Sequence, residues 1–207
     1  MHDIQVKKDH YYNVNYNHKA RWITYFYQMN LLKELGILSA LEVGPGHGWM
    51  KKIIADLGVS VETVDFDPAL KPDYVGSIEK LPNPDNSYDA VCAFEVLEHL
   101  PFETLIQNLN EMARVAKKYV IFSVPDHRHT LFHINFKIPF FKYVNFMLKI
   151  NTYKEHKFDG QHYWEIGKKG YSPKRVKKTI ESNGFKIVKS FVPTDTPTNH
   201  FFVLIKE

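Results

Sequence analysis

A run of closely spaced glycines constrains this chain most strongly. The apolar run Ala40–Val43 leads into Gly44, Gly46 and Gly48, and a helix-like pattern begins immediately afterwards. This order predicts a buried strand, a tight turn and a helix, with glycines where side chains would keep a ligand away from the backbone. The turn therefore predicts a site for a nucleotide-like ligand. Trp49 stands where a dinucleotide fingerprint has its third glycine, which argues against NAD.

Strand-like and helix-like segments alternate along most of the chain. The expected helices lie at 20–35, at 50–57, after Pro101 and after Pro173, and the expected strands lie at 40–43, 59–65, 74–77, 90–94 and 119–124. Such alternation predicts a doubly wound α/β fold with a mostly parallel sheet. Two final β-rich runs, 185–192 and 200–205, share a short connection, which favours an antiparallel pair at the sheet edge.

Composition excludes several functional classes. Lys plus Arg exceed Asp plus Glu by 27 − 23 = 4, which does not imply a nucleic-acid-binding protein. A single cysteine, Cys92, excludes an internal disulfide framework and favours a reducing compartment. The N-terminus lacks the apolar region of a secretory signal, so we expect a cytoplasmic location. Segment 131–150 contains three lysines and Pro139, so no membrane span is expected there.

Two acidic residues narrow the choice of ligand. Asp65 ends the second expected strand, 65 − 44 = 21 positions after the first glycine, where a carboxylate can accept hydrogen bonds from a ribose diol. Glu42 lies within the first strand, where its charge would repel phosphates and attract an ammonium or sulfonium group. The ligand is therefore expected to be cationic and free of phosphate.

These features, together with the stretch GSIEKLPNPDNSYDAV and the block FEVLEHL, resemble the class I S-adenosylmethionine-dependent methyltransferases, in particular their small UbiE or type-11 branch. The resemblance covers about residues 37–125. It implies a Rossmann-like fold whose seven-stranded, mostly parallel sheet has an antiparallel C-terminal strand, and it implies S-adenosylmethionine as the cofactor, which leaves as S-adenosylhomocysteine.

The resemblance also implies roles for individual residues. Glu42 would orient the methionine ammonium, Asp65 would hold the ribose and Phe66 would lie against the adenine. Ser77 stands where many relatives have an aspartate, so Ser77 and the Ile78 backbone would be weaker adenine contacts. The remaining residues expected at the cofactor are Gly44, Pro45, Gly46 and Gly48 in the turn, Phe94 and Glu95 near the methyl group, and Arg21 near the carboxylate.

The block Glu95-x-x-Glu98-His99 gathers two carboxylates and an imidazole within one turn. This set could hold a divalent metal, and it is similar to the metal-assisted methyltransferases of quinone biosynthesis and of small-RNA 2′-hydroxyl groups. In the latter a further histidine completes the site, and here His127, His156 or His162 could play that part. Related enzymes that need no metal carry a similar block, so no metal site is favoured here.

Residues 126–170 interrupt the alternation and are expected to form a substrate cap. The segment HKFDGQHYWEIGKKGYS concentrates polar and aromatic side chains, and loops beyond the carboxyl ends of the strands form the ligand pocket in this fold. His162 is the candidate general base, with Glu165 as the partner that orients it.

Segment 131–150 is aromatic and basic, without an acidic residue from His127 to Lys154. It is expected to be a lid buried against the domain, a dimer contact, or a helix lying on anionic lipid; Pro139 favours the first two. A monomer and a homodimer both remain open.

We therefore expect one methyltransferase domain over residues 1–207, made of an N-terminal arm and helix (1–36), a cofactor-binding half (37–125), the cap insertion (126–170) and a C-terminal helix and strand pair (171–207). The arm, with Tyr11, Tyr12 and Trp22, is expected to fold over the cofactor. Methylation of a hydroxyl on a small or medium acceptor, such as a glycan or secondary metabolite, is preferred. Two alternatives are a metal-dependent hydroxyl methyltransferase of RNA or quinone-like substrates, and a non-catalytic cofactor-binding regulator or scaffold.

Overall fold

The structure is a computed structural model, which describes residues 8–11, 13, 15–137, 139–140 and 143–206. Its helices are α1 (Lys8–Tyr11), α2 (Lys19–Glu34), α3 (Trp49–Ile54), α4 (Leu105–Val115) and α5 (Pro173–Glu181). Its strands are β1 (Ser39–Val43), β2 (Ser60–Asp65), β3 (Tyr74–Val75), β4 (Tyr88–Phe94), β5 (Ala116–Pro125), β6 (His129–Lys137), β7 (Tyr143–Ile150), β8 (Phe185–Phe191) and β9 (Asn199–Lys206).

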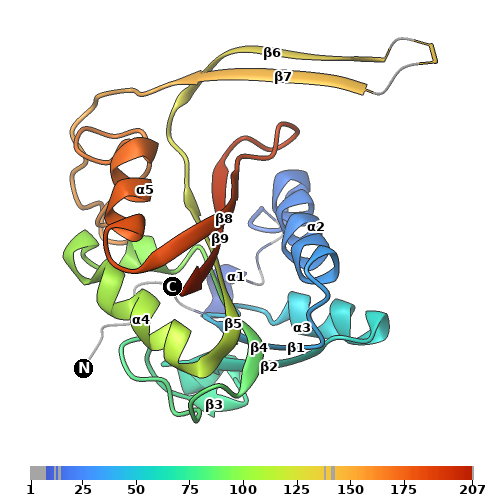
Figure 1. The fold of residues 1–207 in the computed structure, drawn as a ribbon, viewed down its shortest axis with the longest axis vertical. Coiled ribbons are helices and arrows are strands. Elements are labelled where there is room, and N and C mark those ends of the chain that lie inside the picture. The colour runs from blue at the N-terminus through green and yellow to red at the C-terminus, as the bar shows by residue number, and fades with distance from the viewer. Residues whose placement is uncertain (1–7, 12, 14, 138, 141–142, 207) are drawn as a thin grey trace.

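Seven strands form one sheet in the order β3-β2-β1-β4-β5-β9-β8 (Figure 1). β1 pairs in parallel with β2 and β4, and β4 with β5, whereas β9 runs antiparallel to β5 and β8. This confirms the predicted Rossmann-like fold, with the final strand pair at one end of the sheet and β8 outermost. The strand order reverses between β1 and β4, and in such sheets ligands bind in the crevice beyond the carboxyl ends at this point.

Helices cover both faces of the sheet (Figure 1). Alternate side chains of a strand point to opposite faces, so Ala40 joins the core that contains residues of α2 and α3, whereas Leu41 joins the core of α4 and α5. Burial on both faces explains why the central strands are apolar along their whole length.

β6 and β7 form a separate two-stranded antiparallel ribbon that projects from the body (Figure 1). Every β6 position is exposed. The expectations of a buried lid and of an interfacial helix at 131–150 are therefore wrong, because apolar and polar residues alternate from Phe132 to Lys137 with the period of a strand. The dimer contact stays a prediction. Among the described residues, no helix has the length and apolar character needed to cross a membrane.

Candidate active site

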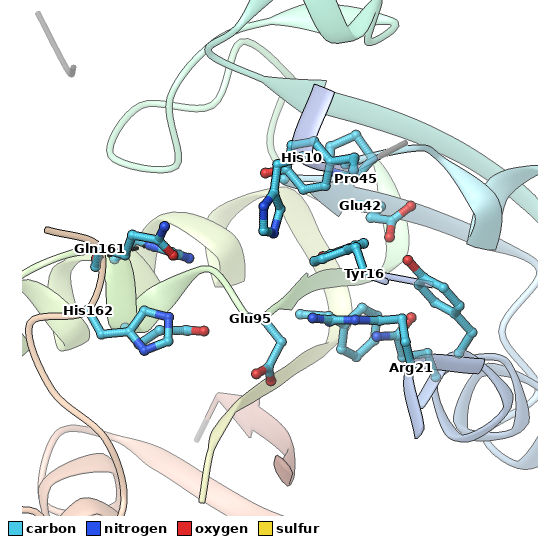
Figure 2. Close-up of a pocket in the computed structure, with 16 residues that line it drawn as sticks. His10, Tyr16, Arg21, Glu42, Pro45, Glu95, Gln161 and His162 are labelled. Atoms are coloured by element: carbon cyan, nitrogen blue, oxygen red, sulfur yellow. Dashed lines mark hydrogen bonds between the residues drawn. The ribbon is translucent and has the colours of Figure 1, made fainter. Parts of the chain in front are cut away.

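A pocket of about 310 Å³ opens at the carboxyl ends of β1 and β4 (Figure 2). The N-terminal segment, α2, the turns after the two strands and the loop 151–170 all contribute to its lining. The predicted residues that line it are Arg21, Glu42, Gly44, Pro45, Gly46, Phe94, Glu95 and His162, together with Glu98 and His99 of the possible metal block. The predicted residues outside the lining are Gly48, Asp65, Phe66, Ser77, Ile78 and Glu165.

The glycine turn forms one wall of this pocket. Gly44 and Gly46 have φ values of 68° and 55°, in the left-handed region that favours glycine. A Cβ atom at Gly44 would lie 2.6 Å from Cγ2 of Val96, so a larger residue would force a rearrangement. Gly48, with φ 65°, precedes α3 as its N-terminal cap. The bare backbone of the turn can therefore approach a ligand closely.

Glu42 lies at the end of β1, beside this wall. Its side chain is buried, and its Oε2 atom has no hydrogen-bond partner among the described residues. Burial raises the pKa of Glu42 to about 8, although the charge of Lys51 opposes this shift. A buried carboxyl group in this state is stabilised as a carboxylate when a cationic group binds beside it. The residue therefore fits an ammonium ligand.

The residues expected at the ribose and adenine lie around the end of β2, outside the pocket. Oδ1 of Asp65 accepts the backbone N–H of Asp67 at 2.9 Å, and burial raises the pKa of Asp65 to about 6. The Phe66 ring is 44% exposed, and Ser77 lies in a turn where its Oγ accepts a backbone N–H at 3.3 Å. The Ile78 side chain is part of the core, so its backbone is what it can offer to a ligand.

The N-terminal segment covers the glycine turn. A Cβ atom at Gly46 would lie 3.1 Å from the ring of Tyr11. The rings of Tyr11, Tyr16 and His47 form a cluster with centroids 5.6 to 5.8 Å apart. Burial raises the pKa of the Tyr11 hydroxyl, and the nearby charge of Asp65 adds to the increase. The Tyr11 ring therefore lines the pocket beside Gly46.

Helix α2 presents Arg21 to the pocket. The guanidinium carbon lies 4.5 Å from the centroid of the Tyr16 ring. Tyr25 and Gln28 line the pocket as well; the sequence interpretation missed both, although their spacing of four and seven from Arg21 places them on one helix face. Tyr12 lies outside the described residues, so its expected place in the arm stays a prediction.

The turn after β4 directs two carboxyl groups toward the pocket. Glu95 has φ 56°, and its Oε1 accepts a hydrogen bond from Oγ of Ser123 at 2.7 Å. Glu98 is fully buried, and neither of its carboxyl oxygens has a hydrogen-bond partner among the described residues. Burial raises the pKa of both groups, and the charge of Glu95 raises that of Glu98 further. This part of the pocket favours a proton or a positive charge.

The loop after the ribbon brings His162 to this acidic end (Figure 2), and Glu165 contacts this histidine from outside the pocket lining. Nδ1 of His162 lies 2.9 Å from Oε1 of Glu165. Burial lowers the pKa of His162, but the hydrogen bond and charge of Glu165, with the charges of Asp159 and Glu95, outweigh burial and leave the pKa raised. The predicted pair is therefore in contact, with the histidine facing the pocket and the glutamate behind it.

Three hydrogen bonds attach this loop to the turn after β4. Trp164 is fully buried, and its Nε1 donates to the carbonyl of Leu97 at 3.1 Å. The backbone N–H of Tyr163 donates to the carbonyl of Glu98 at 2.8 Å. Nδ1 of His99 lies 3.0 Å from the carbonyl of Gln161. Together these bonds fix the position of His162 relative to β4.

Glu98, His99 and His162 form a compact group of potential metal ligands. One ligand atom from each lies within 4.8 Å of the others. Burial and the charge of His162 lower the pKa of His99 to about 4, so this imidazole is neutral at pH 7. The group contains Glu98 and His99 of the predicted set together with His162, one of the three histidines expected as a possible further ligand, and it leaves out Glu95.

The chain is similar to known methyltransferases in part of its sequence and in its fold. The family model described as Methyltransferase domain (Methyltransf_11) matches residues 41–124. No curated protein sequence matches the chain. Magnesium protoporphyrin IX methyltransferase from Synechocystis PCC 6803, solved with bound S-adenosylmethionine, is similar in structure, with a TM-score of 0.58 and 16% identity over 91% of this chain and 80% of that chain.

Two further solved structures are similar. One is 1,6-didemethyltoxoflavin-N1-methyltransferase from Burkholderia thailandensis, with its substrate and S-adenosylhomocysteine bound (TM-score 0.61, 14% identity, 96% of this chain and 84% of that chain). The other is an S-adenosylmethionine-dependent methyltransferase from Mesorhizobium loti (TM-score 0.60, 17% identity, 92% and 99%).

At these identities the solved structures establish a common fold. The family match adds the activity, because residues 41–124 span the glycine turn, Asp65 and the acidic turn after β4. The cofactor of that family fits this pocket. Gly44 and Gly46 let it approach the backbone, and the buried carboxylate of Glu42 suits its ammonium group. Residues 41–124 therefore belong to a class I S-adenosylmethionine-dependent methyltransferase domain, and the chain is an S-adenosylmethionine-dependent methyltransferase.

Proposed function

We propose that this enzyme transfers the methyl group to a hydroxyl oxygen of a small or medium acceptor, with glycan-like molecules and secondary metabolites as the substrate class. One observation carries the proposal: the hydrogen-bonded pair His162–Glu165 reaches the same pocket as the glycine turn and Glu42. A hydroxyl group becomes a better nucleophile as it loses its proton, and an imidazole supported by a carboxylate can accept that proton.

In the donor half of the site, Glu42 would accept hydrogen bonds from the methionine ammonium and Arg21 would pair with the methionine carboxylate. The backbone of Gly44, Pro45 and Gly46 would lie along the methionine portion. Phe94 and Glu95 would face the methionine portion and the reacting methyl group.

In the adenosine half, Asp65 would hold the ribose, Phe66 would lie against the adenine, and Ser77 with the Ile78 backbone would contact its edge. We propose that Tyr11 shifts when the donor binds, because its ring lies against Gly46 and near Asp65.

The donor, when bound, supplies a methyl group on a sulfonium centre for direct displacement. The residues of this chain orient the acceptor and hold its proton. Because Nδ1 of His162 faces Glu165, the ring donates its Nδ1–H to that carboxylate and presents Nε2 to the acceptor hydroxyl. Glu165 then stabilises the imidazolium that forms. Trp164 and its hydrogen bond keep this pair in place.

The acidic end of the pocket limits which charges an acceptor can carry. Glu95 is half-buried and Glu98 is buried in the same pocket lining as His162, so a carboxylate or phosphate on the acceptor would be repelled there. Hydroxyl-rich or cationic acceptors fit better. The volume of about 310 Å³ is at the lower end of small-molecule sites, and the methionine portion of the donor would share it with the acceptor, which favours an acceptor of modest size.

The test combines calorimetric titration of the donor with an assay of S-adenosylhomocysteine formation on a panel of sugars, phenols, amines and carboxylic acids. We expect turnover on hydroxyl acceptors. His162→Gln should leave the donor Kd unchanged and lower kcat by about 10²- to 10⁴-fold, whereas the exposed ribbon residue His129, changed to Gln, should have no effect. Full activity of His162→Gln, or turnover on amines alone, would contradict the proposal. Donor binding without turnover on any acceptor would favour the non-catalytic alternative.

A second candidate is a metal-dependent hydroxyl methyltransferase of RNA or quinone-like substrates. The specific observation behind it is the buried Glu98, whose oxygens have no partner among the described residues and which lies next to two imidazoles. In that case His162 would bind the cation, and Glu165 would orient the His162 ring through their hydrogen bond. Dialysis against EDTA should then abolish activity and Mn²⁺ should restore it, whereas a general base at His162 predicts full activity in EDTA.

A further inference from the structure

The two sides of the ribbon, β6 and β7, differ in character. The register pairs Phe132 with Leu148, Ile134 with Phe146, and Phe136 with Val144, and residues directly opposite each other share a face. The apolar face consists of seven side chains, which are 36% to 54% exposed: Phe132, Ile134, Phe136, Val144, Phe146, Leu148 and Ile150. No polar side chain interrupts the three pairs from Phe132–Leu148 to Phe136–Val144, and His129 lies opposite Ile150 at one end of the face.

The opposite, polar face is the side that attaches to the body. The side chain of Asn145 donates a hydrogen bond to Oγ1 of Thr194, in the loop between β8 and β9. Nζ of Lys149 lies 3.0 Å from Oδ1 of Asp126 and 2.5 Å from the carbonyl of Pro197. Because these contacts arise from the polar face, the apolar face points away from the body.

A ribbon of two strands is marginally stable in water on its own, and a buried apolar face is the usual source of its stability. A contiguous exposed apolar surface of this kind marks a contact with another surface. The apolar face therefore needs a partner.

The charges on the ribbon favour a neutral partner over anionic lipid. Lys137 and Lys149 belong to the polar face, on the side opposite to the apolar one. Lys149 is 3% exposed and paired with Asp126, and Nζ of Lys137 lies 5.2 Å from the centroid of the Tyr143 ring. Neither of these lysines lies on the apolar face, so among the described residues of the ribbon this face presents no lysine to anionic headgroups.

We propose that the apolar face packs against the apolar face of a second copy of this chain, forming a two-layered homodimer. Seven half-exposed side chains of this size supply about 500 Å² per copy, or about 1,000 Å² in total, which reaches the lower limit of specific interfaces. A neutral face without charges is complementary to itself, as a two-fold contact requires. The central pair Ile134–Phe146 would lie nearest the two-fold axis.

The test measures the mass of the full-length protein by sedimentation velocity and light scattering at micromolar concentration. We expect a dimer. Ile134→Asp should weaken the dimer at least 100-fold. Asn135→Asp adds the same charge one residue away on the polar face and should change the dissociation constant less than threefold. A wild-type protein that is monomeric up to 100 μM would overturn the proposal, as would equal effects of the two variants.

A crosslinking experiment avoids the charged substitutions. Ile134→Cys should form a disulfide-linked dimer in air, whereas Asn135→Cys should not, and the native Cys92 is buried. Donor titration and circular dichroism check that each variant is folded. Vesicles of phosphatidylcholine with phosphatidylserine test the other occupant. A monomeric protein that sediments with these vesicles, and loses this binding in Ile134→Asp, would replace the dimer with a lipid contact.

Discussion

Nδ1 of His162 lies 2.9 Å from Oε1 of Glu165, and the glutamate side chain is outside the lining of the pocket that the histidine faces. The hydrogen bond and charge of Glu165 therefore act on the histidine and not directly on a substrate. Because they outweigh the effect of burial, the pKa of His162 is above its ordinary value. The protonated ring cannot act as a base, so kcat/KM should rise with pH through this raised pKa and then level off.

Glu165→Gln should move that rise to lower pH. Without the carboxylate, burial dominates and the pKa of His162 falls. The plateau should also drop about tenfold or more, because the imidazolium loses its stabilising charge. Glu155→Gln, an exposed change of the same type in the same loop, serves as the control. A rise at unchanged pH in Glu165→Gln would show that another group controls the rate.

Glu42 predicts a pH dependence of donor binding. The pKa of Glu42 is raised to about 8, and the ammonium binds the carboxylate form. Donor affinity should therefore increase from pH 6 to pH 8, by up to about tenfold per pH unit. Titration calorimetry checks this. Glu42→Gln should bind more weakly and without this pH dependence, whereas Glu181→Gln, exposed on α5, should behave as wild type.

Trp164 predicts a link between stability and positioning of the base. Trp164→Phe removes a buried donor and leaves the Leu97 carbonyl without it, which should cost about 1–3 kcal/mol of unfolding free energy. The loop that carries His162 should loosen, so kcat should fall while the donor Kd stays unchanged. Urea unfolding and initial rates measure both effects. Tyr163→Phe is the control, because the Tyr163 contact to Glu98 uses its backbone. Equal loss of donor binding in Trp164→Phe would indicate general damage.

Glu98 predicts a gain in stability on substitution. Burial and the charge of Glu95 raise the pKa of Glu98. Above about pH 4.5 the unfolded chain has released the proton of this carboxyl group, whereas the folded protein still holds it. Stability contributed by this position is therefore lost as pH rises. Glu98→Gln should raise Tm at pH 8 and leave it nearly unchanged at pH 4. Mn²⁺ should raise the Tm of wild type, and not that of Glu98→Gln, if the metal-dependent candidate is correct.

The sheet and the places of Glu42, Gly44 and Gly46 at the pocket could be predicted because their signals are local. Gly44, Gly46 and Asp65 belong to one strand-turn-helix-strand unit, and the order of these elements follows from the residue pattern between positions 40 and 65. Glu42 adds a charge where a strand would otherwise be apolar. The pair His162–Glu165 was predictable for the same reason, since three residues separate its members.

Contacts between distant segments were not predictable in this way. Tyr16 and Gln161 line the same pocket although they are 145 residues apart in the sequence, and no spacing rule connects them. The ribbon is a different case. The alternation from Phe132 to Lys137 has a clear strand period, but the abundance of aromatic residues obscured it and suggested burial within the domain.

Asp126 determines how the ribbon is mounted. Its buried carboxylate contacts Lys149 of β7 and also Arg128 and His200. Although burial opposes it, these partners hold the pKa of Asp126 well below its ordinary value. Tilting the ribbon would separate buried opposite charges, which typically costs about 3–5 kcal/mol. Because Asp126 directly follows β5, these ion pairs fix the orientation of the ribbon relative to the central sheet. In a dimer formed through the two ribbons, the angle and distance between the two pockets would therefore depend on the contacts of Asp126 within each subunit.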